Sequence, residues 1–492
     1  MDLIVSIDIG SSGVRASAYT IKGKLISFGK QTYKTYYDKP GWAEQDPNDW
    51  KMATRISLKK MVENLKLPYK IMGIGLTGQC PTYVPVDKNI NPVGRAFIYQ
   101  DNRAVNETFE LEKKYGSRLI HDITGHRLLA FYILPKILWQ RANQPCLFKN
   151  IAYILQPRDY IAYYLTGQIA TDETHANATL LYELKQHRWN KKLMTELNLD
   201  TNIFPNKVLM PWQIVGELRK SIAESVGLTS GIPIVIGAAD SQCCCLGVGA
   251  VRPEILSEMS GTSSCLNSTV LNPVNDINIG NYTHVIPNAW CTEIGLNATG
   301  ANLEWLTNIL YKKDSNRYNL LKENIKKIKV GADGLIFIPY LTGGERDNPL
   351  LKGGFYNLNL YHNAGDMAKA VLEGVAFAIR ERIERLSKST CSFKSIYISG
   401  GGALLDEWNE IKTNIFGVPV YAIKDVDGAE LGAAMLAGIG SGVFKDYQEA
   451  IKNCVCDGKE FLPNLKIHAT YNELYEMFLE VEDKFVSNKS LA

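Results

Sequence analysis

The sequence predicts an α/β protein made of two related halves. The first half opens with a strand, a turn of glycine and serine and a second strand, over Ile4 to Tyr19. The same pattern returns near the middle of the chain, over Ile255 to Val270. Each half also contains an apolar strand that ends in a glycine-rich turn, at Ile71 to Gln79 and at Ser395 to Ala403. A chain of 492 residues is too long for one core, so we expect two large domains.

The composition is typical of a globular protein and argues against several other classes. Apolar residues make up 46% of the chain and charged residues 21%. The net charge of +3 is small and evenly spread, so no nucleic-acid or membrane partner is expected. Polar residues at 240–242 interrupt the longest apolar stretch, 232–251, which argues against a transmembrane span. Asp2 and Asp8 interrupt the first apolar run, so no secretory signal is predicted and we expect a cytoplasmic protein.

The ten cysteines and seven histidines predict neither a metal site nor a disulfide framework. Cys243 to Cys245 are adjacent, and Cys454 and Cys456 are one residue apart. Neither arrangement has the spacing of zinc ligands, and adjacent cysteines cannot easily bridge one another. We interpret the cysteines as reduced, mostly buried small residues.

The first turn has the features of a phosphate-binding loop. Gly10 to Gly13 offers several backbone N–H groups with no bulky side chain in the way. Asp8 lies just before this turn, where a carboxylate repels bare phosphate but can hold a hydrated Mg²⁺ against it. The alternative is an ordinary hairpin with a solvated aspartate. The second turn, at Ser260 to Ser264, favours the phosphate interpretation, because two facing hairpins can hold the phosphates of a nucleotide between them.

Apolar spacing and capping residues predict the other elements of the first half. A helix is expected from Trp50 to about Leu65, with Asn48 or Asp49 as its cap. The segment from Ala104 to Leu228 is predicted to be largely helical and to form an insertion that shapes the wall of a cleft. A buried strand at Ile232 to Ile236 then leads to Asp240. Further strands are expected at 24–36, 71–76, 82–86 and in a segment that ends at 99–103.

The second half is predicted to contain four helices after its hairpin. One runs from Asp366 to Leu386 with its apolar residues on one face, and one runs from Asp406 to Phe416. The segment Ala429 to Ala437 is so rich in alanine and glycine that we expect another backbone to approach it closely. Thr470 and Glu473 predict a capping box for a C-terminal amphipathic helix. Its predicted buried stripe comprises Leu474, Met477, Phe478, Val481 and Phe485.

Two familiar nucleotide motifs do not apply to this chain. Gly73 to Gly78 matches the dinucleotide fingerprint letter by letter, but two of its glycines lie inside a strand and the turn leads to another strand. The nearest approach to a P-loop, Gly23 to Lys30, has one residue too many and is followed by Gln31 where Ser or Thr is needed. A nucleotide site in this chain must therefore be of another type.

Asp240 is the candidate general base. It follows a buried strand, small residues from Gly237 to Ala239 precede it, and nothing nearby in the sequence supplies an Arg or Lys partner. An acid that a strand delivers into a cleft among small side chains is placed to accept a proton from a hydroxyl group. The alternative is a helix N-cap, a position that aspartate favours. These residues alone leave both interpretations open.

Nine segments of the chain match, in order, the motifs of a known family. They are SIDIGSSGVR at 6–15, GWAEQDPNDW at 41–50, GLTGQ at 75–79, GAADSQ at 237–242, MSGTSS at 259–264, FIPYLTGGER at 337–346, KAVLEGVAFAI at 369–379, SGGGALLDEW at 399–408 and DGAELGAAMLA at 427–437. With these motifs the chain resembles the FGGY carbohydrate kinases of the actin/hexokinase superfamily, and most closely the xylulokinases, from Ile4 to about Gly442.

The resemblance implies two domains of the actin/hexokinase type, which are ribonuclease H-like, with a central cleft. Residues 1–250 would form the N-terminal domain, with the sugar and the catalytic base. Residues 251–492 would form the C-terminal domain, with the nucleotide and the C-terminal helix. The resemblance also implies a small sugar or polyol as the binding partner, and it is compatible with a homodimer.

The implied activity is ATP-dependent phosphorylation of a sugar or polyol hydroxyl group. Asp240 would be the general base and Asp8 would organise Mg²⁺ at the phosphates. Phosphoryl transfer needs charge neutralisation and positioning more than covalent help, and the domains are expected to close on the substrate to exclude water. The implied cofactor-binding residues are Asp8, Gly10, Ser11, Ser12 and Arg15 at the first turn, Gly261 and Thr262 at the second, Gly300 beside the phosphates, and Gly401 and Gly402 at the adenosine.

The positions for the sugar depart from the xylulokinase pattern. Cys80 and Pro81 stand where xylulokinases usually carry Met-His, and Ser241 stands where Asn usually follows the catalytic Asp. Glycerol kinases carry Arg-Glu at 80 and 81 and Trp at Tyr99, so glycerol fits worse. An extra glycine also appears at 342–346, in a loop that borders the cleft in the family. The candidate substrate-binding residues are Gln79, Cys80, Pro81, Tyr99, Asp101, Phe131, Asp240 and Ser241. For Gln79, Tyr99, Asp101 and Phe131, packing or a loop contact is an equally good interpretation.

D-Xylulose is the first expectation for the substrate, with D-xylulose 5-phosphate as the product. The runner-up is another ketose, polyol or sugar acid, with ribulose, L-xylulose, erythritol, glycerol and gluconate as candidates. An actin-like or chaperone-type ATPase without a sugar substrate is the alternative from a different class. Against it, the motifs at 41–50 and 237–242 belong to the sugar-kinase branch. A catalytically dead relative does not fit a chain that keeps Asp8, Asp240 and Thr262.

Overall fold

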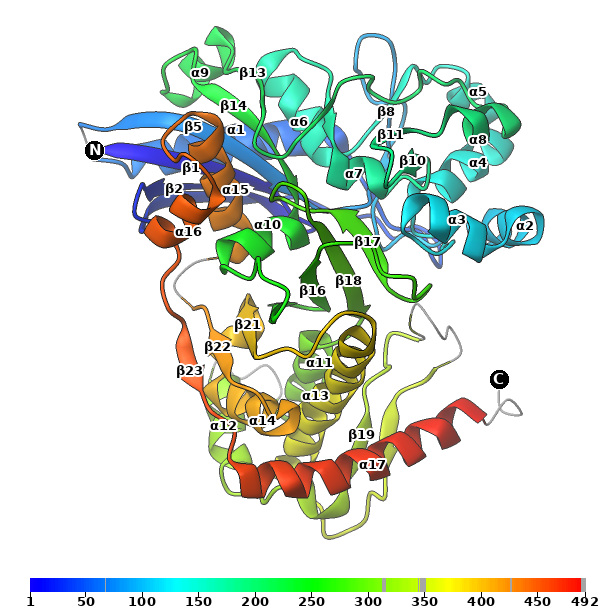
Figure 1. Cartoon of the computed structure of the whole chain (residues 1–492), viewed down its shortest axis with the longest axis vertical. Coiled ribbons are helices and arrows are strands. Elements are labelled where there is room, and N and C mark those ends of the chain that lie inside the picture. Colours follow the sequence, from blue (N-terminus) through cyan, green and yellow to red (C-terminus); the bar gives the residue numbers. More distant parts are fainter. Residues whose placement is uncertain (67, 312–315, 344, 346–350, 425–426, 488–492) are drawn as a thin grey trace. The chain divides into compact units, whose positions relative to one another are not determined.

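A computed structural model describes residues 1–66, 68–311, 316–343, 345, 351–424 and 427–487, and Figure 1 draws their helices and strands. The chain forms two compact units, and each is assembled from separate segments. The first comprises Met1–Val251, Val270–Thr292 and Val426–Cys456, and the second comprises Arg252–Thr269, Glu293–Asp425 and Asp457–Ala492. The predicted α/β class with two domains is confirmed. The division at residues 250 and 251 stays a prediction.

The first unit is organised around a six-stranded sheet in the order β13-β14-β5-β1-β2-β3. These strands are β1 (Asp2–Ile9), β2 (Gly13–Thr20), β3 (Leu25–Thr32), β5 (Lys70–Gly78), β13 (Ile214–Glu217) and β14 (Pro233–Ala239). β1, β2 and β3 pair antiparallel, whereas β5 runs parallel to both β1 and β14. The carboxyl ends of β1, β5 and β14 therefore meet at one edge of the sheet.

Helices cover both faces of this sheet. The odd-numbered residues of β1, such as Val5 and Ile7, share a core with Trp50 and Met61 of α1 (Pro47–Glu63). Alternate residues of a strand face opposite sides, and Ile4 lies next to α15 (Gly428–Gly440). In Figure 1 the orange α15 lies against the blue strands β1 and β5. The apolar β-branched residues of β1 are thus buried on both sides.

Glycine allows α15 to approach its neighbours closely, as its composition predicts. A Cβ atom added at Gly75 of β5 would lie 2.0 Å from the carbonyl oxygen of Ala433. A Cβ atom at Gly432 would lie 1.9 Å from the carbonyl oxygen of Cys243, on α10 (Asp240–Gly247). Larger residues at these positions would force the backbones apart. The glycines of β5 therefore serve packing, which agrees with the rejection of a dinucleotide fingerprint there.

The insertion after residue 104 alternates short helices with strands of two to four residues. Its apolar residues, such as Leu111 and Ile133, form a separate core together with Tyr83 and Phe97, which precede the insertion. The remaining elements of the first unit are β4 (Glu44–Gln45), β6 (Val84–Val86), β7 (Ala96–Phe97), α2 (Val105–Tyr115), α3 (Ser117–Thr124), α4 (Ile133–Asn143), α5 (Pro145–Phe148), β8 (Tyr153–Leu155), α6 (Pro157–Thr166), β9 (Thr171–Asp172), α7 (Glu173–Asn177), β10 (Tyr182–Glu183), β11 (Arg188–Trp189), α8 (Lys191–Glu196), β12 (Val208–Leu209), α9 (Lys220–Val226), β17 (Gly280–Thr283) and α16 (Tyr447–Cys454).

The second unit contains most of a seven-stranded sheet in the order β17-β18-β16-β15-β21-β22-β23. β15 and β16 form the second predicted hairpin, and β15, β21 and β22 run parallel. The carboxyl ends of these three strands share one edge, as in the first unit. The elements are β15 (Ile255–Ser260), β16 (Ser264–Val270), β18 (Trp290–Leu296), α11 (Gly300–Leu310), α12 (Arg317–Ile325), η1 (Ala332–Gly334), β19 (Ile336–Ile338), β20 (Gly354–Tyr356), α13 (Ala364–Ser389), β21 (Ser395–Ser399), η2 (Gly401–Leu404), α14 (Asp406–Phe416), β22 (Val420–Ala422), β23 (Lys459–Phe461) and α17 (Leu465–Ser487).

Two predicted helix starts are wrong by a few residues. Asp46, rather than Asn48 or Asp49, caps α1, because its carboxylate accepts from the Asn48 amide and Pro47 occupies the first helical position. Asn363 caps α13, and Asp366 is the third helical residue, which completes a capping box with Asn363. In both cases a second Asp or Asn within three residues offered an alternative cap.

The predicted start of the C-terminal helix is also wrong, whereas its predicted buried stripe is confirmed at Phe478 and Val481 and wrong at Met477. α17 already begins at Leu465, and Thr470 lies inside it, with its hydroxyl group donating to the carbonyl of Lys466. Met477 is 44% exposed. The buried residues of the helix include Tyr471, Tyr475, Phe478 and Val481. Leu474 and Phe485 are half-buried, and the prediction missed the two buried tyrosines, whose apolar rings and polar tips suit such positions.

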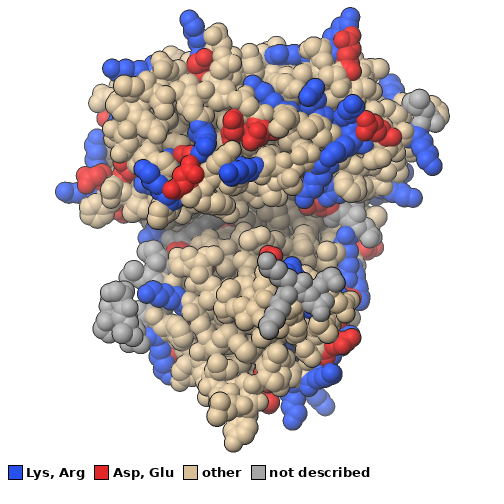
Figure 2. Space-filling view, turned by 180° about the vertical axis from the view of Figure 1, so that it is seen from behind, with Lys and Arg blue, Asp and Glu red and all other residues tan. Residues whose placement is uncertain are grey.

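Charged side chains of both signs are interspersed on the face drawn in Figure 2. This distribution agrees with the small net charge of +3. In the part of the chain that the structure describes, no helix combines the length and the apolar character that a bilayer span requires.

Candidate active site

The carboxyl ends of three parallel strands bring two acidic residues to the same edge of the first sheet. In the register of the sheet, Asp8 of β1 lies opposite Thr77 on β5, and Ala239 of β14 lies opposite Gly78. β5 therefore lies between the strand that delivers Asp8 and the strand that delivers Asp240. The sequence predicted each acid from its own strand, and the sheet order places both beside β5.

The first turn has engaged carbonyl groups and available amide groups. The carbonyl of Ser11 accepts from the side-chain amide of Gln45 at 2.8 Å, and the carbonyl of Gly10 accepts from the hydroxyl group of Tyr33. Within the described residues, the N–H groups of Ser11 and Ser12 have no hydrogen-bond partner, and both residues are exposed. Exposed amides in a turn of small residues are suited to binding anionic oxygens.

Gln45, which the sequence analysis did not single out, supports this turn from behind. Its side chain is fully buried, and its Oε1 atom accepts from the indole N–H of Trp50 at 3.1 Å and from Nε2 of Gln79 at 2.9 Å. A buried glutamine must satisfy its amide in this way. The segment 41–50 thus holds the turn in place, a role that its sequence did not disclose.

Asp8 lies among other acidic residues, and one of its carboxylate oxygens has no hydrogen-bond partner. Its Oδ1 atom is buried and has no hydrogen-bond partner. Burial, together with the carboxylates of Glu430, Asp427 and Asp240, raises the pKa of Asp8 well above its ordinary value, and Arg15 opposes this only in part. A divalent cation near these four carboxyl groups would relieve their mutual repulsion.

Glu430, on the first turn of α15, and Asp427, its N-cap, are candidate site residues that the sequence analysis did not single out. Glu430 accepts from the hydroxyl groups of Ser17 and, at 3.4 Å, Tyr19, and it forms an ion pair with Arg15 at 3.2 Å. Burial and the neighbouring Asp427 raise the pKa of Glu430 to about 7. The available sequence signal was two acids three residues apart at a helix start, which helix capping also explains.

The guanidinium group of Arg15 already has an acidic partner and an aromatic partner. Arg15 lies opposite Asp8 in the hairpin, its guanidinium pairs with Glu430, and it stacks over the ring of Phe28 at 4.5 Å. Its implied role in cofactor binding stays a prediction.

Asp240 is the first residue of α10 and not its cap. The N-cap position belongs to Ala239, which makes no side-chain capping bond, so the interpretation of Asp240 as an N-cap is wrong. The carboxylate of Asp240 accepts from the amide of Ser241 at 2.8 Å, and the residue is partly exposed whereas Ser241 is 5% exposed. An accessible carboxylate at the end of a buried strand has the setting that a general base requires.

The turn of the second hairpin, like that of the first, has carbonyl groups that accept hydrogen bonds and an exposed amide group. The carbonyl of Thr262 accepts from the amides of Thr299 at 2.9 Å and Ala301 at 3.1 Å, and the carbonyl of Gly261 accepts from the amide of Gly300 at 3.1 Å. Gly261 and Thr262 are exposed, and within the described residues the amide of Thr262 has no partner. A Cβ atom at Gly300 would lie 2.5 Å from the carbonyl oxygen of Gly261, so only glycine allows this approach.

The glycine turn after β21 lies beside the second hairpin. A Cβ atom at Gly402 would lie 2.1 Å from the hydroxyl oxygen of Ser260, the last residue of β15. Gly401 is exposed and has open space where a side chain would be. The second unit thus brings Gly261, Gly300 and Gly402 together at the carboxyl edge of its parallel strands.

The predicted sugar-side residues are all in the first unit, but they differ in accessibility. Gln79 is 2% exposed. Its Oε1 atom has no hydrogen-bond partner, and its Nε2 atom donates to Oε1 of Gln45. Cys80 precedes Pro81 in a cis peptide and packs against a small cluster that includes Cys245 and Cys291. Pro81 is buried and Cys80 is partly exposed.

Asp101 is fully buried and its carboxylate is already engaged. It accepts from Nε of Arg103 at 2.9 and 3.0 Å, from Nη2 at 2.7 Å and from the amide of Ala43 at 2.7 Å. This geometry favours the loop-contact interpretation over direct sugar binding. Tyr99 and Phe131 are partly exposed, and the ring of Phe131 lies 4.3 Å from that of Tyr132.

Lys136 of α4 is a further residue that the sequence analysis did not single out. It is fully buried and donates to the carbonyl of Ile98 at 2.7 Å, directly before Tyr99. Burial lowers the pKa of Lys136 to about 7, although the carboxylate of Asp101 opposes the change. Lys136 thus anchors the segment that carries two predicted sugar-binding residues.

The predicted site residues divide between the two units. The first unit holds Asp8, Asp240 and the sugar-side residues, and the second holds Gly261, Thr262, Gly300, Gly401 and Gly402. Of the loop with the extra glycine, Gly344 and Arg346 lie outside the described residues, whereas Glu345 accepts from the amide of Asn297 at 3.1 Å. Among the described residues, no three His, Cys, Asp or Glu side chains are grouped as ligands of one metal ion.

Family models match most of the chain. The model of the N-terminal domain of the FGGY family of carbohydrate kinases matches residues 3–247, and that of the C-terminal domain matches residues 257–441. The chain belongs to the FGGY family of carbohydrate kinases. The FGGY motifs recognised in the sequence therefore identified the family correctly.

Named relatives of this FGGY kinase cover nearly its whole length. A xylulose kinase of Staphylococcus epidermidis is 28% identical over 97% of this chain and 96% of its own length. A xylulose kinase of Staphylococcus xylosus is 29% identical over 98% and 100%. Two crystal structures, of a xylulose kinase from Rhodospirillum rubrum and a gluconate kinase from Lactobacillus acidophilus, superpose with TM-scores of 0.89 and 0.91 at 24% identity, covering at least 98% of both chains. These similarities support the FGGY kinase fold along the entire chain.

Proposed function

We propose that this FGGY kinase transfers the γ-phosphoryl group of ATP to a hydroxyl group of D-xylulose. The observation that carries the proposal is the pair Asp8 and Asp240 at neighbouring parallel strand ends, with the exposed amides of Ser11 and Ser12 beside them. Such an arrangement supplies what phosphoryl transfer needs, namely anion-binding donors, a place for a cation and a base for the accepting hydroxyl group.

In this proposal Asp240 accepts the proton of the sugar hydroxyl as the oxygen attacks phosphorus. Its partial exposure and its position at the start of α10 suit that role. General-base catalysis of this kind is worth about 10²- to 10⁴-fold in rate. Ser241, buried behind it, leaves room where the related kinases usually carry a larger Asn, and this difference bears on the sugar.

The residues around Asp8 fit a magnesium ion that keeps most of its water. The unpartnered Oδ1 atom of Asp8 offers a buried acceptor, and Asp427 and Glu430 add negative charge nearby. Mg²⁺ is commonly held by one or two carboxylates, waters and substrate phosphates, so Asp8 with few further protein ligands would suffice. When bound, the ion would neutralise charge on the transferring phosphoryl group.

The two turns would supply the donors for phosphate oxygens. In the first unit these are the amides of Ser11 and Ser12, and in the second unit the amide of Thr262. Their carbonyl groups are bonded back into each unit, so the peptide planes are held in one orientation before any ligand binds. Donors held in this way avoid the cost of reorganisation during the reaction.

Xylulose is proposed as the sugar because the named relatives at 28–29% identity are xylulose kinases. The departures at Cys80, Pro81 and Ser241 keep the runner-up sugars open, and one protein of the same fold is named a gluconate kinase. The pocket residues thus leave the choice of sugar to experiment.

A screen with direct product detection tests the proposal. ATP and Mg²⁺ are incubated with D-xylulose, L-xylulose, ribulose, erythritol, glycerol and gluconate, and the sugar phosphates are identified by mass spectrometry. We expect D-xylulose phosphate to form with the highest kcat/KM. A higher kcat/KM for another sugar would overturn the choice of xylulose, and ATP hydrolysis that no sugar stimulates would overturn the transferase activity itself.

A further inference from the structure

The strand that leads to Asp240 contains an irregularity. β14 pairs with β5 up to Val235 and resumes the ladder at Ala238, with a shift of register between them. Gly237 has a φ of +70°, and a Cβ atom there would lie 1.6 Å from the carbonyl oxygen of Leu76. Bulges of this kind re-aim the residues that follow them. The direction of Asp240 therefore depends on how this bulge is held.

Two buried side chains bond to the backbone on either side of the bulge. Nη1 of Arg158 on α6 donates to the carbonyl of Ile236 at 2.6 Å. The amide of Ala239 donates to the hydroxyl oxygen of Thr174 on α7 at 2.9 Å. The first contact precedes Gly237 and the second directly precedes Asp240. The amides of Ile236 and Gly237 also donate to the carbonyls of Gln213 and Pro211, each at 3.0 Å, so the side chains act together with these backbone bonds to hold the bulge.

Asp172 joins the two contacts into one network. Its Oδ1 atom accepts from Nη2 of Arg158 at 2.6 Å, and its Oδ2 atom accepts from the hydroxyl group of Thr174 at 2.6 Å. All three side chains are fully buried. A continuous chain of bonds therefore runs from the carbonyl of Ile236 to the amide of Ala239. Hydrogen bonds are stronger and less adaptable in such a low-dielectric setting.

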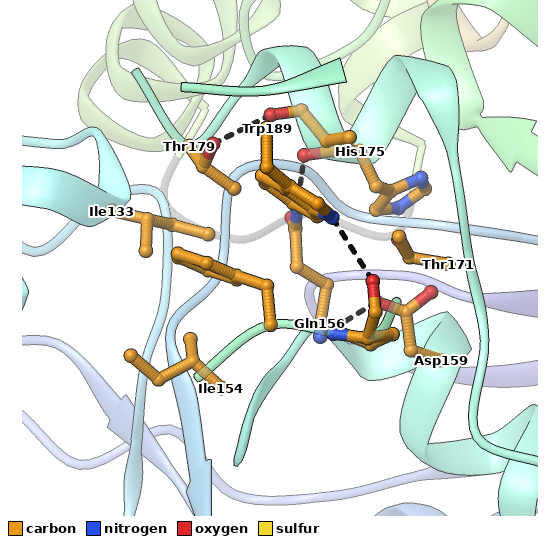
Figure 3. A pocket seen from close by; sticks show the side chains of 11 residues that line it. Ile133, Ile154, Gln156, Asp159, Thr171, His175, Thr179 and Trp189 are labelled. Carbon is orange, nitrogen blue, oxygen red and sulfur yellow. Dashed lines mark hydrogen bonds between the residues drawn. The ribbon is translucent and has the colours of Figure 1, made fainter. Parts of the chain in front are cut away.

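The surroundings of the network are closely packed. Figure 3 shows Gln156, Asp159 and His175 around a cavity of about 10 Å³, which has room for about one water molecule. Gln156 donates from its side chain to the carbonyl of His175 at 2.6 Å and from its backbone to Asp159 at 3.1 Å. α6 and α7 are thus tied to each other, which leaves Arg158 and Thr174 little freedom to move.

We infer that Arg158, Asp172 and Thr174 are positioning residues for the Asp240 carboxylate, which they orient through the backbone of β14. The inference rests on the proposed role of Asp240 as general base. It differs from a merely structural role, because loss of the Thr174 hydroxyl group should slow the chemical step in protein that is still folded and still binds both substrates.

Thr174→Val and Thr174→Ser test the inference, with Thr179→Val as a matched control. The hydroxyl group of Thr179 also donates to a carbonyl, that of Ala176, and accepts from an amide, that of Leu181, but these contacts lie within its own loop. We expect Thr174→Val to lower kcat at least about tenfold, as small misplacements of reacting groups do. The KM values for sugar and ATP should change less than about threefold. Thr174→Ser should restore kcat to within about threefold of the native enzyme, and Thr179→Val should keep it.

Hydrogen exchange gives a second readout that does not depend on activity. Peptides that cover residues 236–242 should exchange their amides faster in Thr174→Val than in the native protein, Thr174→Ser or Thr179→Val. The inference is overturned if Thr174→Val keeps its kcat, if Thr179→Val loses as much, or if exchange at 236–242 is unchanged. Failure of the native enzyme to phosphorylate any sugar would instead overturn the proposed function, and exchange would still show whether Thr174 holds the bulge.

Discussion

At the scale of single residues, Asp8 is the most informative side chain in the first unit. A carboxyl group with a raised pKa and a buried, unpartnered oxygen is an unfavourable arrangement in an isolated protein. Strain of this kind concentrates where a ligand relieves it. The Mg²⁺ ion proposed above, held near Asp8, would lower the pKa of this carboxyl group and satisfy its oxygen.

Replacement of Asp8 tests this explanation. Asp8→Asn keeps the size of the side chain and removes its charge, so the apparent affinity for Mg²⁺ in the kinase reaction should fall roughly 10- to 100-fold. Asp2→Asn, at an exposed acid on the same strand, is the matched control and should leave the Mg²⁺ dependence unchanged. Titration of the initial rate with Mg²⁺ at saturating ATP measures both. An unaltered Mg²⁺ requirement in Asp8→Asn would contradict the assignment.

Sequence reasoning singled out candidate residues that lie on their own predictable element and passed over candidates that are defined by a distant partner. Asp8 and Asp240 each end an apolar strand, so local pattern was enough to find them. Glu430 matters because Ser17, Tyr19 and Arg15, more than 400 positions earlier, surround it. Asp101 is likewise engaged by Ala43. No spacing rule brings such pairs together before the fold is known.

At the scale of elements, the contact between α10 and α15 connects Asp240 with the acids of α15. Gly247 and Gly432 let the two helices touch at their backbones, since a Cβ atom at either position would lie 1.9 Å from a carbonyl oxygen of the other helix. The composition of α15 predicted the close approach. The composition did not predict that α10 is the partner, because a segment rich in glycine and alanine indicates close packing but not the identity of the neighbouring element.

A single methyl group should disturb this contact. Gly432→Ala would normally favour a helix, but here its Cβ atom meets the carbonyl of Cys243, and we expect a loss of about 1–3 kcal/mol in the free energy of unfolding. Gly401→Ala, where a Cβ atom has open space, should change stability by less than about 0.5 kcal/mol and serves as the control. Urea unfolding of the three proteins measures the difference. A more stable Gly432→Ala protein would show that the helices do not pack as described.

At the scale of the whole molecule, stability should depend on pH through buried carboxyl groups. Glu373 of α13 accepts from the hydroxyl group of Tyr471 at 2.7 Å and from the amide of Gly331 at 3.1 Å. Burial raises the pKa of Glu373 to about 7, despite opposition from Lys369. A group whose folded pKa is raised keeps a proton that it loses on unfolding, so the folded state loses stability as pH rises from about 4.5 towards 7.

Glu373→Gln should remove this part of the pH dependence, because glutamine keeps both acceptor bonds and does not ionise. The stability of the variant relative to the native protein should therefore improve between pH 5 and pH 7.5, by no more than about 3 kcal/mol. Glu430 titrates in both proteins and cancels in the comparison. Urea unfolding at the two pH values gives the numbers, and an equal pH dependence in both proteins would refute the assignment.

The internal repeat predicted that the molecule contains two similar sheets. It did not predict which distant segments pack onto each sheet. The two hairpins and the two strands that end in glycine predicted two similar sheets, and each sheet contains one such hairpin and one such strand. The segment Val426–Cys456 follows the second hairpin in the sequence but packs into the first unit, because α15 covers β1 and β5. β13 was also missed, since a four-residue edge strand has too little pattern to be recognised.

The central claim is that Asp240 is the base of a sugar kinase, and Asp240→Asn tests it most directly. The variant and the native enzyme are compared in sugar phosphorylation and, separately, in ATP binding by calorimetry. We predict that kcat falls by about 10²- to 10⁴-fold. The dissociation constant for ATP should stay within about threefold, because the anion-binding amides are untouched. A variant that phosphorylates the sugar at the native rate would contradict the account.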